Sequence, residues 1–98
     1  MARVVWTLPA FSDLDRIAEF IAADAPFRAS VFVEEILEVV DQLEDFPRIG
    51  RVIPEKNDPI FRELIFGNYR ILYRLKDQLI EILSVVNSAQ QLDIKKLQ

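Results

Sequence analysis

The chain has 98 residues, 51% of them hydrophobic, and a formal net charge of −4. It contains neither cysteine nor histidine, which excludes disulfides, thiolate chemistry, histidine-assisted catalysis and histidine-ligated zinc, and we expect no metal and no cofactor. The first residues lack the layout of a signal peptide and any 18-residue apolar run, so we expect a single cytoplasmic domain over residues 1–98 without a membrane contact.

The amino-terminal part predicts a strand followed by a helix. Arg3–Trp6 is a short β-branched run that ends in tryptophan. Thr7 then offers a capping oxygen, and Pro9 suits a first helical turn. Apolar residues recur at helical spacing on one face, namely Phe11, Leu14, Ile17, Ala18 and Ile21. Charged residues fall mostly on the other face, namely Asp13, Asp15, Arg16 and Glu19.

A second helix is predicted from about Pro26 to Glu44. We expect Asp24 to cap it and Pro47 to end the helical segment. Its apolar stripe consists of Ala29, Val33, Ile36, Leu37, Val40 and Leu43. Its outer face is acidic and carries Glu34, Glu35, Glu38, Asp41 and Asp45. We interpret the two helices as an antiparallel hairpin whose apolar faces pack on a sheet.

The stretch from Phe61 to Leu75 predicts two strands joined by the two-residue loop Gly67-Asn68. Asp77-Gln78 is expected to form a second tight turn, which completes a three-stranded meander with Tyr69 opposite Val86. Side chains alternate between the faces of a strand. The face expected on the helices contains Leu64, Phe66, Tyr69, Ile71, Tyr73, Leu75, Ile80, Ile82 and Val86. The other face contains Glu63, Ile65, Arg70, Leu72, Arg74, Glu81, Leu83 and Val85.

The second face is half apolar and half charged. Arg74 falls opposite Glu81, and Glu63 lies diagonal to Arg70, so both arginines have carboxylates within reach. For Arg70, an internal ion pair and a contact with a partner protein are equally open. Such a face suits partial cover by a partner segment or by the chain's own tail.

Charge is distributed unevenly along the chain. Residues 1–47 hold 3 basic and 10 acidic side chains, whereas residues 48–76 hold 7 basic and 3 acidic ones. A general nucleic-acid binder is usually basic overall. We therefore expect no direct sequence-specific binding of nucleic acid, and the local basic patch is either solvated or in contact with a phosphate or an acidic protein.

Several short motifs keep a fixed order along nearly the whole chain. They are Ala10-x-x-Asp13-Leu14-x-x-Ile17-x-x-Phe20-Ile21-Ala22, Pro26-x-x-Ala29, Phe46-Pro47-x-x-Gly50-Arg51, Pro54-Glu55, Arg62-Glu63-Leu64, Gly67-Asn68-Tyr69-Arg70-Ile71-x-Tyr73 and Val85-Val86-Asn87. In this order they resemble the RelE/ParE superfamily of type II toxins, and the ParE-like branch in particular. The expected fold is α+β: an N-terminal strand and an antiparallel two-helix hairpin packed on a mainly antiparallel sheet, which a C-terminal three-stranded meander completes.

The resemblance implies two kinds of activity. ParE-like members inhibit DNA gyrase by protein–protein contact, here expected at its A subunit, whereas RelE-like members are ribosome-dependent mRNA endonucleases. Both kinds are neutralised by a cognate antitoxin, which lays a helix and an extended segment over the toxin and forms a hetero-oligomer with it. A third alternative is an inactive relative that binds its antitoxin and takes part in operon regulation.

Chemistry favours the non-nuclease alternative. Asn87 and Gln90 stand where many family members have a histidine and an arginine, and neither titrates near neutrality. We therefore expect no catalytic residue and no enzyme. The residues predicted to contact the antitoxin or the target are Arg51, Arg62, Glu63, Arg70, Leu72, Arg74, Leu83, Asn87 and Gln90. A tail from about residue 88 to residue 98 is expected to order only on binding.

Overall fold

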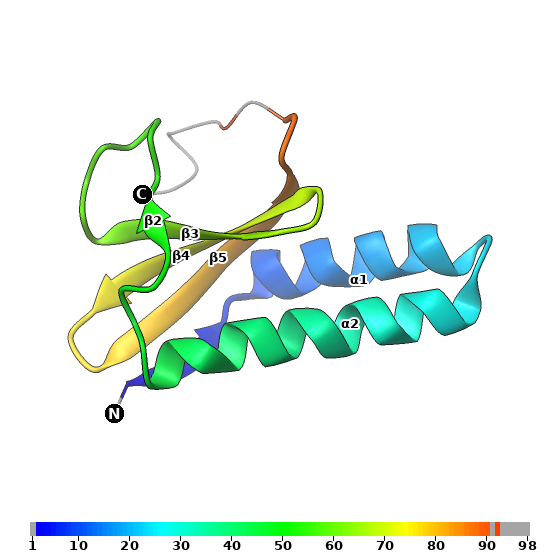
Figure 1. Cartoon of the computed structure of the whole chain (residues 1–98), viewed down its shortest axis with the longest axis horizontal. Helices are drawn as coiled ribbons and strands as arrows, with labels where there is room; N and C mark the ends of the chain where they lie inside the picture. The colour runs from blue at the N-terminus through cyan, green and yellow to red at the C-terminus, as the bar shows by residue number, and fades with distance from the viewer. Residues whose placement is uncertain (1, 91, 93–98) are drawn as a thin grey trace.

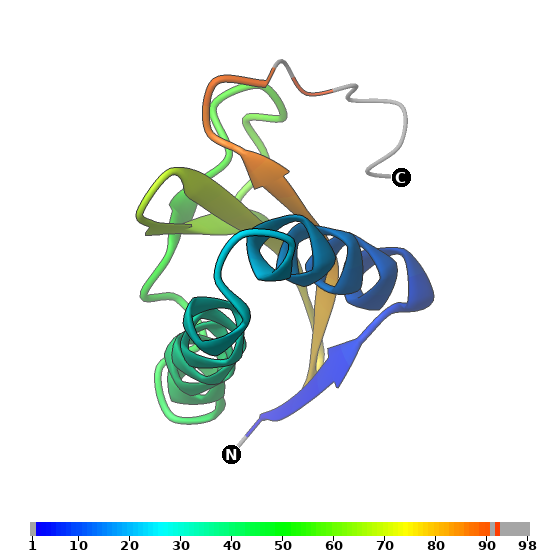
Figure 2. The same ribbon diagram turned by 90° about the vertical axis from the view of Figure 1, so that its right-hand side faces the viewer.

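The computed structural model describes residues 2–90 and 92 and has an α+β fold (Figure 1). A five-stranded sheet has the strand order β1-β5-β4-β3-β2, and the helices pack on one of its faces (Figure 2). The elements in chain order are β1 (Arg3–Trp6), α1 (Leu8–Ala22), α2 (Pro26–Asp41), a 3₁₀ turn (Gln42–Glu44), β2 (Arg51–Val52), β3 (Phe61–Phe66), β4 (Tyr69–Lys76) and β5 (Leu79–Asn87). The predicted fold class is confirmed. β1 runs parallel to β5, and the other pairs are antiparallel.

The helix boundaries follow from the capping chemistry at α1 but not at α2. The hydroxyl oxygen of Thr7 accepts a hydrogen bond from the Ala10 amide, as the sequence predicts, and also donates one to the Ile82 carbonyl on β5. The prediction that Asp24 caps α2 is wrong. Ala25 occupies the cap position without a side-chain hydrogen bond, and Pro26 opens the helix. Asp24 lies one residue too early for its carboxylate to reach the first free amides.

The main core lies between the helical hairpin and the sheet. It contains Ala10, Leu14, Ile36, Val40, Leu43, Ile71, Tyr73, Ile80 and Ile82. Burial of this apolar set is the principal force that holds the hairpin on the sheet. Within the described residues, no helix is both long enough and apolar enough to cross a membrane.

The predicted register is correct at both turns and wrong near the end of β5. Tyr73 pairs with Ile82, but Tyr69 pairs with Asn87 rather than Val86, because β5 carries one extra residue opposite the Leu72/Tyr73 step. Beyond this bulge the predicted sides are exchanged. Val85 pairs with Ile71 on the helix side, whereas Val86 packs with Leu72 on the other face. Strict alternation cannot reveal an inserted residue.

The second face of the sheet is partly covered by the chain itself. The segment between β2 and β3 lies on the side away from the helices (Figure 1). Ile53 of this segment and Phe61 at the start of β3 form a second buried cluster with Leu72, and Leu83 and Leu92 pack against it. The predicted tail falls mostly outside the described residues, so its ordering on binding stays a prediction.

Candidate functional site

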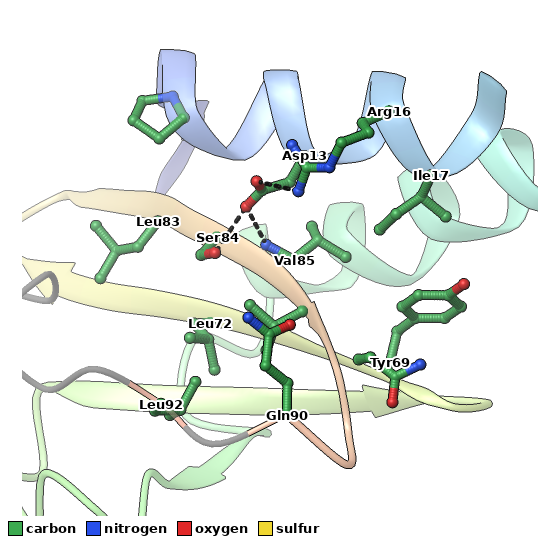
Figure 3. A pocket seen from close by; sticks show the side chains of 13 residues that line it. Asp13, Arg16, Ile17, Tyr69, Leu72, Leu83, Ser84, Val85, Gln90 and Leu92 are labelled. Carbon is green, nitrogen blue, oxygen red and sulfur yellow. Dashed lines mark hydrogen bonds and ion pairs between the residues drawn. The ribbon is translucent and has the colours of Figure 1, made fainter. Parts of the chain in front are cut away.

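A groove of about 550 Å³ opens between α1 and the end of β5 (Figure 3). β1 pairs with β5 only as far as Ile82. Within the described residues, no strand therefore pairs with residues 83–87 on the side of β5 that faces away from β4. The groove occupies this open edge. It is lined by Pro9, Asp13, Arg16 and Ile17 of α1, Tyr69 and Leu72 of β4, Leu83, Ser84, Val85, Val86 and Asn87 of β5, and Gln90 and Leu92 beyond it.

The groove combines an apolar floor with a polar rim. Leu72 and Val85 are buried, Leu83, Val86 and Leu92 are half-buried, and Asn87 and Gln90 are exposed. Such a surface accepts apolar side chains of a partner and offers hydrogen bonds around them. The sequence predicted four of these residues as partner contacts, namely Leu72, Leu83, Asn87 and Gln90, and the structure brings them together here.

Asp13 lines the groove although the sequence did not predict it as a site residue. Its helical position suggested the outer face, but its side chain is only 18% exposed and points at β5. Oδ2 of Asp13 accepts hydrogen bonds from the Ser84 hydroxyl at 2.7 Å and from the Val85 amide at 3.0 Å. Oδ1 accepts one from Arg16 at 3.1 Å. The sequence did hold one signal for a partly buried acid, because Asp13 adjoins Leu14 and therefore lies close to the apolar stripe of the helix.

Three further predicted partner residues form an ion-pair network on the second face instead. The Glu63 side chain is 0% exposed and bridges Arg51 and Arg70. Arg70, with a side chain 7% exposed, also forms two hydrogen bonds of 2.8 and 2.9 Å with Glu55. Hydrogen bonding to Glu55 is the main reason why the pKa of Arg70 is raised. The internal ion pair is therefore present, and a direct contact of Arg70 with a partner stays a prediction.

Glu55 makes the stability of this network dependent on pH. Hydrogen bonds from Arg70 lower the pKa of Glu55 from 4.5 to about 2. A carboxylate with a lowered folded-state pKa stabilises the fold above pH 4.5 and loses this contribution as the pH falls towards 2.

We expect Glu55→Gln to reduce the free energy of unfolding at pH 7 by about 1 kcal/mol, a value kept small because the side chain is partly exposed. The difference from the wild type should shrink steadily below pH 4.5. Urea unfolding at pH 7 and at about pH 3 measures both values. Glu34→Gln on the outer face of α2 is the control and should show no such trend. An equal loss for Glu55→Gln at both pH values would contradict the assignment.

The remaining predicted residues, Arg62 and Arg74, also bond to the chain itself. Arg62 donates hydrogen bonds to the carbonyl oxygens of Pro59, Arg48 and Gly50, which ties the loops on either side of β2 to β3. Arg74 forms the predicted ion pair with Glu81 across β4 and β5. Neither residue lines the groove.

The described residues offer no metal centre, because no three acidic side chains gather among them. All buried side-chain nitrogen and oxygen atoms in this part of the chain have a hydrogen-bond partner. The groove at the β5 edge is the leading candidate site.

Comparisons with known proteins agree on the class. The family model described as "ParE toxin of type II toxin-antitoxin system, parDE" matches residues 4–92. The Y4kP protein of Sinorhizobium fredii is 37% identical over 91 residues, which are 91% of each chain. Toxin RelE2 of Caulobacter vibrioides is 31% identical over 91 residues, covering 92% of this chain and 99% of the relative. A solved chain of the chromosomal ParDE toxin–antitoxin system from P. aeruginosa superposes with a TM-score of 0.76 at 28% identity, covering 89% of this chain and 96% of that one.

The fold, a helical hairpin on a five-stranded mixed sheet, is thus that of the small α+β toxins of the RelE/ParE superfamily. Within this class, the chain belongs to the ParE toxin family of type II toxin–antitoxin systems.

Proposed function

We propose that this protein inhibits DNA gyrase by protein–protein contact at the A subunit and does not cut RNA. The observation that supports this proposal is that the arginines of the sheet are engaged in bonds within the chain. Arg62, Arg70 and Arg74 all bond to carbonyls or carboxylates of the chain itself. RNA cleavage needs cationic groups aimed at a phosphate together with a proton donor and acceptor. The groove has Asn87 and Gln90 at its rim, and these amides supply neither proton transfer nor charge.

The groove at the β5 edge is our proposed docking site for the cognate antitoxin. Its apolar floor suits the apolar stripe of a short helix. On the edge of residues 83–87 the Val85 amide is already bonded to Asp13, and the other backbone groups of this edge suit an extended segment that adds to the sheet. Both parts of the expected antitoxin segment thus find a place on one continuous surface. Leu83 is central to it because it both lines the groove and packs against the second buried cluster.

We expect Leu83→Asp to weaken antitoxin binding by at least about 30-fold, because a charge in an apolar contact is costly and anchor residues contribute about 2 kcal/mol or more. Isothermal calorimetry with the antitoxin from the neighbouring reading frame measures the affinity. Ile65→Asp is the matched control, since Ile65 is an exposed apolar residue of β3 outside the groove. Equal binding by Leu83→Asp and Ile65→Asp would place the antitoxin elsewhere.

Controlled induction in growing cells tests the target. A gyrase inhibitor stops DNA synthesis first, so thymidine incorporation should fall before amino-acid incorporation does. The second candidate function, ribosome-dependent mRNA cleavage, is favoured by the similarity to Toxin RelE2 and predicts the opposite order. Unimpaired growth together with tight antitoxin binding would instead support the inactive, regulatory alternative.

A further inference from the structure

We propose that Asp13 is a positioning residue that selects the bulged register of β5 and thereby shapes the groove for the antitoxin. The inference rests on the proposed antitoxin site for its binding consequence, but its structural part can be tested without any partner. Asp13 reaches β5 from a different layer of the fold, and about 70 residues of chain separate it from Ser84 and Val85.

The bulged register of β5 can be compared with the register that uninterrupted alternation would give. Uninterrupted alternation from the Asp77-Gln78 turn would place Val86 opposite Tyr69 and Ser84 opposite Ile71. The observed bulge instead places Asn87 opposite Tyr69 and Val85 opposite Ile71. A shift by one residue moves every following side chain to the other face of the sheet. Only the observed register therefore gives the groove its Val86 lining beside Leu83 and Leu92.

Asp13 bonds to the two groups that the bulged register presents to α1. The Val85 amide lies on the stretch of β5 beyond the end of β1, and Val85 is only 1% exposed. An N–H group buried at a sheet edge needs an acceptor, and Oδ2 of Asp13 supplies it while also accepting from the Ser84 hydroxyl (Figure 3). In the uninterrupted register these two groups would be displaced from the carboxylate. The hydrogen bonds thus favour the bulge over the alternative.

Arg16 keeps the carboxylate in this orientation. Its guanidinium donates to Oδ1 of Asp13, which leaves Oδ2 directed at β5, and most of its own side chain is exposed at the groove mouth. Asp13 therefore lines the groove, sets the position of β5 and is itself oriented by α1. We do not require it to touch the antitoxin.

The test compares Asp13→Ala, Asp13→Asn and Ser84→Ala with the wild type, and uses Asp15→Ala as the matched control because Asp15 is an exposed acid on the same helix. Nuclear Overhauser contacts between Ile71 and Val85 report the register. Hydrogen exchange at the Val85 amide reports the hydrogen bond. We expect exchange to accelerate by about 10- to 100-fold in Asp13→Ala, the range for loss of a bond to a charged acceptor. Asp13→Asn keeps one acceptor oxygen and should be intermediate.

Antitoxin affinity, measured well below the melting temperature of each variant, is the functional readout. We expect about a tenfold loss for Asp13→Ala, a smaller loss for Ser84→Ala and none for Asp15→Ala. An unchanged Ile71–Val85 contact and unchanged affinity in Asp13→Ala would overturn the inference. If Asp13→Ala does not fold, Asp13→Asn and Ser84→Ala decide by the same criteria. A wild-type protein that does not bind the antitoxin would refute the proposed docking site, and the register measurements would still test the role of Asp13.

Discussion

Replacement of Arg70 by methionine is expected to lower the free energy of unfolding by about 3–5 kcal/mol, the range measured when one partner of a buried ion pair is removed. Among the described residues, the change leaves the fully buried Glu63 carboxylate with the exposed Arg51 alone as a cationic partner. It also frees Glu55 from its hydrogen bonds with Arg70. Urea unfolding followed by Trp6 fluorescence and circular dichroism measures the loss.

Arg74→Met is the control for this prediction. Arg74 also pairs with a carboxylate across neighbouring strands, but both side chains of that pair are partly exposed, so we expect a loss of about 1 kcal/mol or less. The double variant Arg70→Met with Glu63→Gln should recover part of the stability, because it removes the uncompensated charge. Equal losses for Arg70→Met and Arg74→Met would show that burial of the network contributes nothing.

The second large effect is expected at Gly50, where alanine should cost about 3 kcal/mol because the new methyl group cannot be accommodated without movement of buried atoms. A Cβ atom there would lie 2.6 Å from the Glu63 carbonyl oxygen and 2.6 Å from the Tyr73 hydroxyl. That hydroxyl accepts from the Gly50 amide at 2.9 Å and donates to the Pro47 carbonyl at 2.8 Å, and burial raises its pKa. Position 50 thus requires glycine because the Glu63 carbonyl and the Tyr73 side chain lie too close for a Cβ atom.

Gly67→Ala provides the matched comparison for Gly50→Ala. Gly67 has a φ of +56° but open space around it, so alanine there meets only backbone strain of about 1–2 kcal/mol. Thermal or urea unfolding of both variants separates steric exclusion from backbone strain. A Gly50→Ala protein as stable as the wild type would contradict the packing described for Tyr73.

Local patterns were sufficient to predict most of the fold. Thr7 and Pro9 marked the start of α1, helical periodicity placed Leu14 and Ile36 in the core, and Gly67-Asn68 fixed the β3–β4 register. Each of these signals depends only on residues close in sequence. The pairing of Glu63 with Arg70 was also predictable, because a correct hairpin register brings the two side chains together.

What could not be predicted depends on contacts between distant segments. The bulge lies in the middle of β5, and Asp13, which bonds to Val85 just beyond it, belongs to another layer of the fold. Glu55 bonds to Arg70 from the irregular segment between β2 and β3. The position of such a segment cannot be predicted from helical or strand periodicity. For the site, the sequence predicted Leu72, Leu83, Asn87 and Gln90 as partner contacts, and the structure places all four in one groove. It gave equal weight to arginines whose side chains bond to carbonyls and carboxylates of the chain itself.

The most direct test of the proposed function is a supercoiling reaction with purified gyrase, relaxed plasmid and ATP. We expect the protein to reduce supercoiling in proportion to its concentration, and an excess of the cognate antitoxin to restore it. In the same reaction, the Leu83→Asp variant should still reduce supercoiling when the antitoxin is present in excess, because the antitoxin binds it weakly. Undiminished supercoiling at a large molar excess of folded protein, together with cleavage of messenger RNA on translating ribosomes, would contradict the proposal.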